Sequence, residues 1–174
     1  MLHTLDDALK DYFAKWETLV AARKDQDFFE ELAPTAVGWK VSDRNEHDRL
    51  VAELRDKCDL VTGRYMNERW ITKLHLTKTS LHGGVTVIKI MERRPGSNDP
   101  TGLDHVDFYS PAVAEADIVL KREPALEWQH ETNGASWISV RFAGTEAKLR
   151  TDTVLDSYVR DLREARNNIL RSVL

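Results

Sequence analysis

Cysteine is almost absent from this sequence, because Cys58 is the only one among 174 residues. A single thiol excludes an intrachain disulfide and any zinc site assembled from several cysteines. Chains without disulfides are typical of reducing compartments, so we predict a cytoplasmic location. A chain of this length can bury about two-thirds of its unfolded surface, so we expect it to fold without such crosslinks.

Long apolar runs and an excess of positive charge are missing as well. No stretch is apolar for long enough to span a bilayer. The start, "MLHTLDDALKDYF", is acidic and amphipathic, whereas a signal peptide has a basic start and an apolar run. The 29 acidic residues outnumber the 25 Lys and Arg, which gives a net charge of −4. We therefore expect no membrane partner and no general attraction to nucleic acid.

The hydrophobic pattern predicts two opening helices, at 4–23 and 25–32, followed by two similar series of elements. Breaker residues at 93–102, "RRPGSNDPTG", separate the two series. Each series has a strand, a helix and three short strands rich in β-branched or aromatic residues. The predicted strands are 36–41, 59–67, 69–79, 84–92, 103–110, 126–131, 136–142 and 146–152, and the later helices are 46–57, 110–122 and 153–174.

This repeated order predicts an α+β fold, in which two βαβββ units form one curved mixed sheet, an open barrel. Extra helices precede and follow the two units. The concave face of such a sheet can enclose a pocket. The predicted parts of one fused domain are an N-terminal helical extension (1–34), a first βαβββ unit (35–95), a second βαβββ unit (102–152) and a C-terminal helix (153–174).

The order of these segments resembles the vicinal oxygen chelate superfamily of glyoxalase and dioxygenase type, and within it the YecM-like branch of bacterial metal-binding proteins. The segments that carry the resemblance include "PTAVGWKVSD", "VTVIKIMERRPG", "GLDHVDFYSP", "ASWISVRF" and "KLRTDTVLDSYVRDL". The resemblance implies a divalent metal held by His, Glu or Gln side chains from the first and last strand of each unit. Such a metal binds two neighbouring substrate oxygens and acts as a Lewis acid.

Only one of the four implied ligand positions clearly carries a metal-binding side chain. The resemblance places these positions at Val37, at Met91 or Glu92, at His105 and at Arg150. Valine donates nothing, and the permanent charge of arginine repels a divalent ion. We therefore expect a degenerate site without a tightly bound cofactor. A divalent metal could still bind if the substrate completed its coordination.

Strand periodicity places the histidine beside a carboxylate. In "GLDHVDFYSP" strict alternation puts His105 and Asp107 on one face, and Asp104 and Val106 on the other. Asp107 could then orient the imidazole and fix its tautomer. The alternative is a half-exposed histidine that is bonded to a neighbour and has no role, because a lone histidine is weak evidence for a site.

Basic residues on the last two strands favour an anion as the ligand. Alternation places Arg141 on one strand, and Lys148 and Arg150 on the next, opposite the apolar residues of those strands. If the apolar faces pack on helices, these cations meet His105 on the concave side. Arginine can hold a carboxylate or phosphate there with two parallel bonds. A solvated charged sheet face is the alternative.

The preferred interpretation is a glyoxalase-type protein that binds a small anion on the concave face and has a degenerate metal site. The residues predicted to bind the ligand are His105, Asp107, Arg141, Lys148 and Arg150. One alternative is a metal-dependent isomerase, lyase or dioxygenase that uses His105 and Glu92. Another is an interaction protein that binds a partner through its helices at 4–23 and 153–174. The identity of the ligand, catalysis and the oligomeric state stay open.

Overall fold

The computed structural model describes the chain except residues 23–28, 30, 77, 111–125, 131–135 and 174. The elements in chain order are α1 (Leu2–Ala21), β1 (Ala33–Val41), α3 (Arg44–Arg55), β2 (Leu60–Met66), β3 (Arg69–His75), the short 3-10 helix η1 (His82–Gly84), β4 (Val87–Glu92), β5 (Gly102–Tyr109), β6 (Leu126–His130), β7 (Ser136–Phe142), β8 (Thr145–Arg150) and α5 (Val154–Val173). The predicted helices at 25–32 and 110–122 lie mostly outside the described residues.

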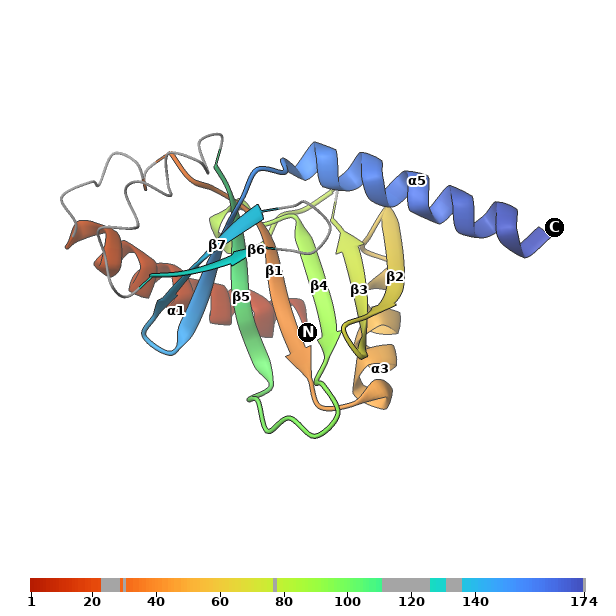
Figure 1. Cartoon of the computed structure of the whole chain (residues 1–174), viewed down its shortest axis with the longest axis horizontal. Coiled ribbons are helices and arrows are strands. Elements are labelled where there is room, and N and C mark those ends of the chain that lie inside the picture. The colour runs from red at the N-terminus through yellow and green to blue at the C-terminus, as the bar shows by residue number, and fades with distance from the viewer. Residues whose placement is uncertain (23–28, 30, 77, 111–125, 131–135, 174) are drawn as a thin grey trace.

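The strands form one mixed sheet in the order β2-β3-β4-β1-β5-β8-β7-β6. In each half the first strand pairs in parallel with the last, β1 with β4 and β5 with β8. The two halves join through the antiparallel pair β1 and β5. The sheet curves (Figure 1), and β2 and β6 are the first and last strands of its order. The predicted α+β fold with a curved mixed sheet is therefore confirmed.

Helices α1 and α3 cover one face of the sheet, which is the face behind the strands in Figure 1. Alternation sends one set of strand residues into the core on that side. The fully buried side chains on that face include Val37, Ile88, Ile90 and Val106. Burial of this apolar surface is the main contribution to stability, at about 25 cal/mol per Å².

Helix α1 is held by its apolar face and is part of the core. Leu5 and Leu9 are fully buried. The ring of Trp16 stacks on Phe108 of β5 with a centroid distance of 4.7 Å. The spacing of three and four that predicts this helix thus corresponds to the packed side.

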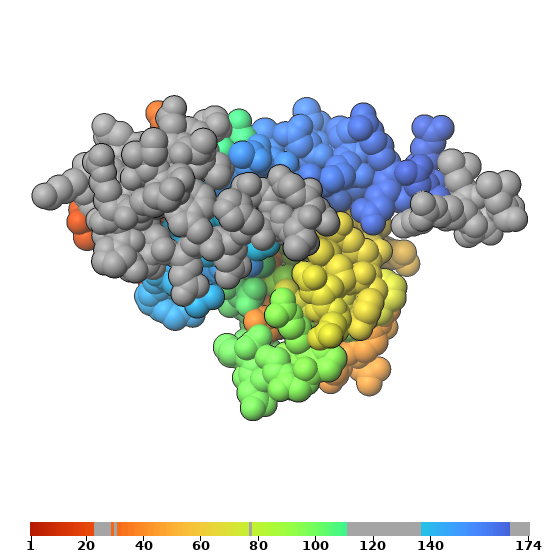
Figure 2. Space-filling model, viewed as in Figure 1, coloured from red at the N-terminus to blue at the C-terminus, as the bar shows by residue number. Residues whose placement is uncertain are grey.

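Helix α5 begins at a reciprocal cap in which Thr153 and Asp156 hydrogen-bond one another. It lies on the β2–β3 hairpin and extends past β2 (Figures 1 and 2). Asp161 joins it to the sheet, because its carboxylate accepts hydrogen bonds from Lys73 at 2.9 Å and from His75 at 2.9 Å. In the described part of the chain, no helix is both long and apolar enough to cross a membrane.

Candidate functional site

The concave face, opposite α1 and α3, holds a pocket of about 330 Å³. The sheet forms its floor, and the first turns of α5 contribute Val154, Ser157 and Arg160 to its wall. Among the described residues, eight basic and two acidic side chains line it. These are Arg64, Arg69, Lys73, Lys89, Arg94, Lys148, Arg150 and Arg160, and Asp107 and Asp152. The pocket is therefore cationic in a chain whose net charge is −4.

The register of the sheet explains why chemically different side chains meet on the pocket floor. Gly38 pairs with Lys89 on one side and with His105 on the other, and His105 pairs with Glu146. Paired residues of neighbouring strands send their side chains to the same face. Gly38 is the gap in this row, because a Cβ there would lie 2.7 Å from Nδ1 and 2.9 Å from Nε2 of His105. The imidazole thus lies directly over the glycine.

A β-bulge brings Asp104 beside His105. Gly38 pairs with His105, but the next residue of β1, Trp39, pairs with Leu103, so Asp104 is the extra residue. A bulge redirects a side chain that strict alternation would send to the opposite face. Asp104 Oδ2 lies 2.8 Å from His105 Nδ1. The prediction that Asp104 faces away from the histidine is therefore wrong.

His105 is buried and neutral. Burial, together with the nearby charge of Lys148, lowers the pKa of His105 to about 4. The Asp104 carboxylate needs a donor, so Nδ1 carries the proton and Nε2 keeps its lone pair. Within the described residues Nε2 has no hydrogen-bond partner. Asp107 Oδ1 is 3.6 Å from Nε2, so Asp104 and not Asp107 orients the ring.

Asp107 holds two basic side chains at the pocket floor. It is 1% exposed, forms a close ion pair with Lys89, and accepts a hydrogen bond from Arg150 Nε at 2.8 Å. Burial alone would raise the pKa of Asp107, but the charges of Arg150 and Lys89 hold it well below the usual value. Burial lowers the pKa of Lys89 to about 8. Asp107 therefore positions cations and does not present free oxygens to a ligand.

The other predicted site residues lie at different depths. Lys148 Nζ is 3.4 Å from His105 Nδ1 and 3.5 Å from Glu146 Oε2, and it lines the pocket together with Arg150. Arg141 is exposed and is absent from the pocket lining. The structure thus brings together His105, Asp107, Lys148 and Arg150, and leaves Arg141 outside.

On the first half of the sheet, the only implied metal position that reaches the pocket in the described structure is Met91, whose thioether is a poor ligand for a hard divalent ion. Val37 is fully buried in the core on the opposite face. Glu92 also lies on that face, where its Oε2 accepts from the backbone N–H of Trp70 at 3.0 Å. Met91 lines the pocket in its place. An enzyme site built from His105 and Glu92 is therefore excluded by the geometry.

The resemblance places the metal position of the last strand at Arg150. In the structure the β8 residue that pairs with His105 is Glu146, which carries a carboxylate. Asp104, His105 and Glu146 offer ligand atoms that all lie within 4.8 Å of one another. These donor types suit a divalent ion. However, Lys40 pairs with Asp104 at 2.7 Å, and Lys148 lies beside His105 and Glu146. The set fits a metal by donor type but not by charge while these ammonium groups stay in place.

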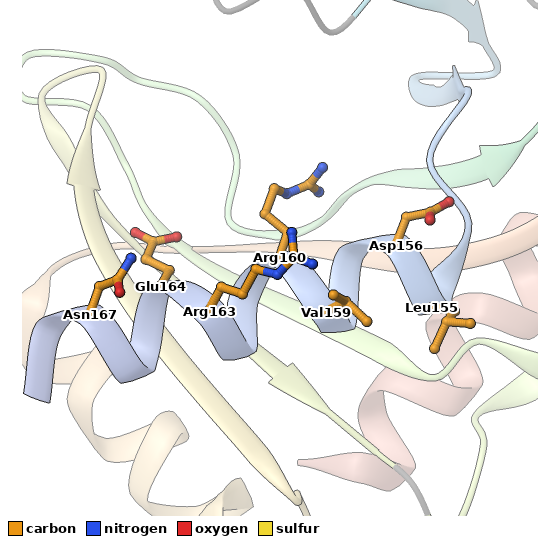
Figure 3. Close-up of a pocket in the computed structure, with 7 residues that line it drawn as sticks. All are labelled: Leu155, Asp156, Val159, Arg160, Arg163, Glu164 and Asn167. Carbon is orange, nitrogen blue, oxygen red and sulfur yellow. The ribbon is translucent and has the colours of Figure 1, made fainter.

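A second hollow of about 730 Å³ lies on α5, and Figure 3 shows it. All of its described lining residues come from this one helix. They are Leu155, Asp156, Val159, Arg160, Arg163, Glu164 and Asn167. Asp156 and Arg160 point away from the side on which Leu155 and Val159 lie (Figure 3). The hollow is a surface depression, and none of the sequence-predicted site residues lies in it.

No protein-family model matches this sequence, and no curated protein matches it. Among solved structures, Protein EC4020 from structural genomics has a TM-score of 0.62 at 12% identity, over 89% of this chain and 86% of its own. A glyoxalase/bleomycin resistance protein/dioxygenase superfamily member from Vibrio splendidus 12B01 has a TM-score of 0.45 at 8% identity, over 70% and 99%. Streptomyces coelicolor methylmalonyl-CoA epimerase has a TM-score of 0.43 at 14% identity, over 67% of this chain and 94% of its own.

The topology decides the fold type. In each half the first strand pairs in parallel with the last, and the two halves join through β1 and β5. This is the duplicated sheet that the resemblance implies. The chain has a vicinal oxygen chelate fold. At these identities the likeness concerns the fold alone, because one fold can host many functions. The assignment to the YecM-like branch stays a prediction.

Proposed function

We propose that this protein binds a small anion on the concave face of its vicinal oxygen chelate fold, at Lys148 and Arg150 beside His105. The observation that supports this function is the excess of basic side chains in the described pocket lining, eight against two acidic ones. Like charges in a shielded pocket repel one another, and a bound anion relieves that repulsion. The cations thus favour a carboxylate or phosphate.

Arg150 is held ready for such a ligand. Its Nε donates to Asp107 at 2.8 Å, and its guanidinium carbon lies 5.1 Å from the ring centre of Trp137. A planar group fixed on two sides loses little freedom when it binds an anion. Lys148 adds a second positive charge from the same strand.

His105 adds a preference for an anion that carries a donor. Its Nε2 keeps a lone pair and has no partner among the described residues. A hydroxyl next to the carboxylate of the ligand would supply the missing hydrogen bond. We therefore expect a hydroxy acid to bind better than the plain acid, and the same nitrogen would be the proton acceptor in any reaction.

The test is an NMR titration of the full chain with acetate and with glycolate, which differ by one hydroxyl. Lys148→Gln should weaken binding of both about tenfold or more, since a charge-assisted bond contributes about 1.5–3 kcal/mol. His105→Asn should remove the preference for glycolate. Arg163→Gln is the control, because Arg163 is exposed on α5 and does not line the pocket. If Lys148→Gln and Arg163→Gln bind alike, the proposed function is wrong.

Arg160 cannot serve as a neutral control. It belongs to the outer helix, but it lines the pocket and pairs with Asp152 at 2.6 Å. The start of α5 is a wall of the pocket.

A metal-dependent enzyme is the second candidate, and the cluster of Asp104, His105 and Glu146 favours it. Metal analysis after dialysis separates the two candidates. A stoichiometric divalent ion that is lost in Glu146→Gln would support the enzyme. The proposed anion-binding function expects no such ion in the dialysed chain.

The interaction-protein alternative now concerns α5 alone. The apolar face of α1 is buried in the core, with Leu5 and Leu9 fully buried. On α5, Leu155 is 69% exposed and Leu162 is 49% exposed. An exposed apolar stripe can bind a partner, but single exposed apolar residues are also common on protein surfaces.

A further inference from the structure

Three arginines around one end of the pocket differ from the other cations, because they have no acidic partner among the described residues. Arg64, Arg69 and Arg94 all line the pocket. Within the described chain, no salt bridge or side-chain hydrogen bond joins any of them to another residue. By contrast, Lys89 and Arg150 both pair with the same carboxylate, that of Asp107.

The register of the β2–β3 hairpin brings two of these arginines together. Arg69 pairs with Met66, and Arg64 lies two residues before Met66 on the same strand. Residues two apart share a face, so Arg64 and Arg69 project from the same side of the hairpin. On β4, Met91 pairs with Ile71 of β3, and Arg94 follows three residues later. The three guanidinium groups thus come from adjacent parts of the sheet.

Arg69 has no hydrogen-bonded carboxylate among the described residues, although the charges of Asp104 and Asp99 act on it to raise its pKa. Its Nε is buried and has no hydrogen-bond acceptor among the described residues. A buried donor without an acceptor is unfavourable, and such groups normally find a partner. Burial, and then the charge of Arg94, lower the pKa of Arg69. The two arginines are therefore close enough to repel each other.

We propose that Arg64, Arg69 and Arg94 form a second oxyanion subsite, for a phosphate or carboxylate group. Arginine matches these planar or tetrahedral oxyanions with paired N–H donors. An oxyanion here would accept from the unpartnered Nε of Arg69 and would neutralise the repulsion with Arg94.

The location of the subsite defines the class of ligand. Arg69 is on β3 and Lys148 on β8, which are four strands apart in the order of the sheet. Neighbouring strands are about 4.8 Å apart, so the two ends lie about 19 Å apart along the sheet, and its curvature shortens the direct path. The ligand is then an elongated molecule with an oxyanion at each end. This class of ligand rests on the proposed function, because its inner end is the anion at Lys148 and Arg150.

Inorganic phosphate and acetate, titrated separately into the full chain by NMR, test the two ends. Arg69→Gln should weaken binding of either anion about tenfold at the NMR signals of β3 and much less at those of β8, and Lys148→Gln should do the reverse. Arg94→Gln should also weaken phosphate binding, and it removes a loop side chain that is exposed. Arg55→Gln is the control, because Arg55 is exposed in the last turn of α3 on the other face of the sheet.

A series of dicarboxylates, from malonate to dodecanedioate, then tests whether one ligand spans both subsites. Affinity should rise with chain length to an optimum in the wild type, and Arg69→Gln should reduce the longer acids to the affinity of a monoacid of equal length. The second subsite is excluded if phosphate binds equally to the Arg69, Arg94 and Arg55 variants at the NMR signals of β3. If binding at the signals of β8 does not respond to Lys148→Gln while binding at those of β3 responds to Arg69→Gln, the proposed function fails and the outer subsite stands.

Discussion

At the scale of single residues, the position of His105 depends on Gly38, which has no side chain. The imidazole lies over Gly38, and Asp104 holds its Nδ1 from the bulged position of β5. Alanine at position 38 would place a Cβ 2.9 Å from Nε2, which is inside normal contact distance. The ring must then rotate away from Asp104. The glycine is therefore required by a close approach and not by a turn.

Gly38→Ala should consequently act on the histidine and leave the fold intact. We expect the Nδ1–H signal of His105 to shift or broaden in long-range histidine NMR spectra, and glycolate binding to weaken severalfold. Gly63→Ala is the control, because its Cβ would meet only Thr72 Oγ1 at 3.2 Å. An unchanged imidazole spectrum in Gly38→Ala would contradict this account of the site.

Lys148 is the residue that opposes a metal at the cluster of Asp104, His105 and Glu146. Its ammonium lies 3.4 Å from His105 Nδ1 and 3.5 Å from Glu146 Oε2. Two unit charges of the same sign that are 4 Å apart near a protein surface repel each other by about 4 kcal/mol. Lys148→Met should therefore raise the affinity for Mn²⁺ or Co²⁺ at least tenfold, measured by EPR or calorimetry. The double variant with Glu146→Gln should lose this gain. Equal metal affinity in wild type and Lys148→Met would show that charge does not control the cluster.

At the scale of elements, local pattern predicts most strands and their order but not the contacts between them. Alternation and the breaker segment at 93–102 are visible in a single sequence, and the sheet follows them. The bulge at Asp104 is not visible, because it depends on which residues of β1 lie opposite. Lys89 is a pocket residue that the sequence does indicate, because a lysine between two isoleucines interrupts an otherwise apolar strand. Arg64 and Arg69 lie on the same side of the hairpin because of its register, which cannot be predicted from their spacing in the sequence.

The two terminal helices should differ sharply in what their apolar residues contribute to stability. Leu9 of α1 is fully buried, whereas Leu162 of α5 is 49% exposed. Leu9→Ala should lower the free energy of unfolding by about 2–5 kcal/mol, because it leaves a cavity in the core. Leu162→Ala should change it by only about 0.5 kcal/mol. Urea unfolding of both variants measures the difference, and similar losses would mean that α5 packs against more than β2 and β3.

At the scale of the whole molecule, the sheet separates stability from binding. The face under α1 and α3 contains the core, and the opposite face contains the buried charges and the pocket. An acidic chain thus presents a cationic interior surface, which bulk net charge does not reveal. The same arrangement makes stability depend on pH, because the charged and neutral groups of the pocket floor are buried with their partners.

His105 dominates that dependence in mild acid. Its pKa is about 4 in the folded chain and about 6.5 in an unfolded one. As the pH falls from 6.5 to 4, the unfolded state binds a proton that the folded state refuses, so the free energy of unfolding should fall by about 3 kcal/mol. Below pH 4, the low pKa values of Asp104 and Asp107 continue the loss, because the unfolded state then binds more protons at these carboxylates. Urea unfolding at pH 7.5, 5.5 and 4.5 measures the first part.

The variant that isolates this effect is His105→Asn, whose free energy of unfolding should change little between pH 6.5 and 4 but should still fall below pH 4. His3→Asn is the matched control, because the side chain of His3 is 87% exposed on α1 and should leave the wild-type slope in place. A wild-type slope in His105→Asn would mean that another group takes up the proton, and the imidazole on the pocket floor would then not be the buried neutral base on which the preference for a hydroxy acid depends.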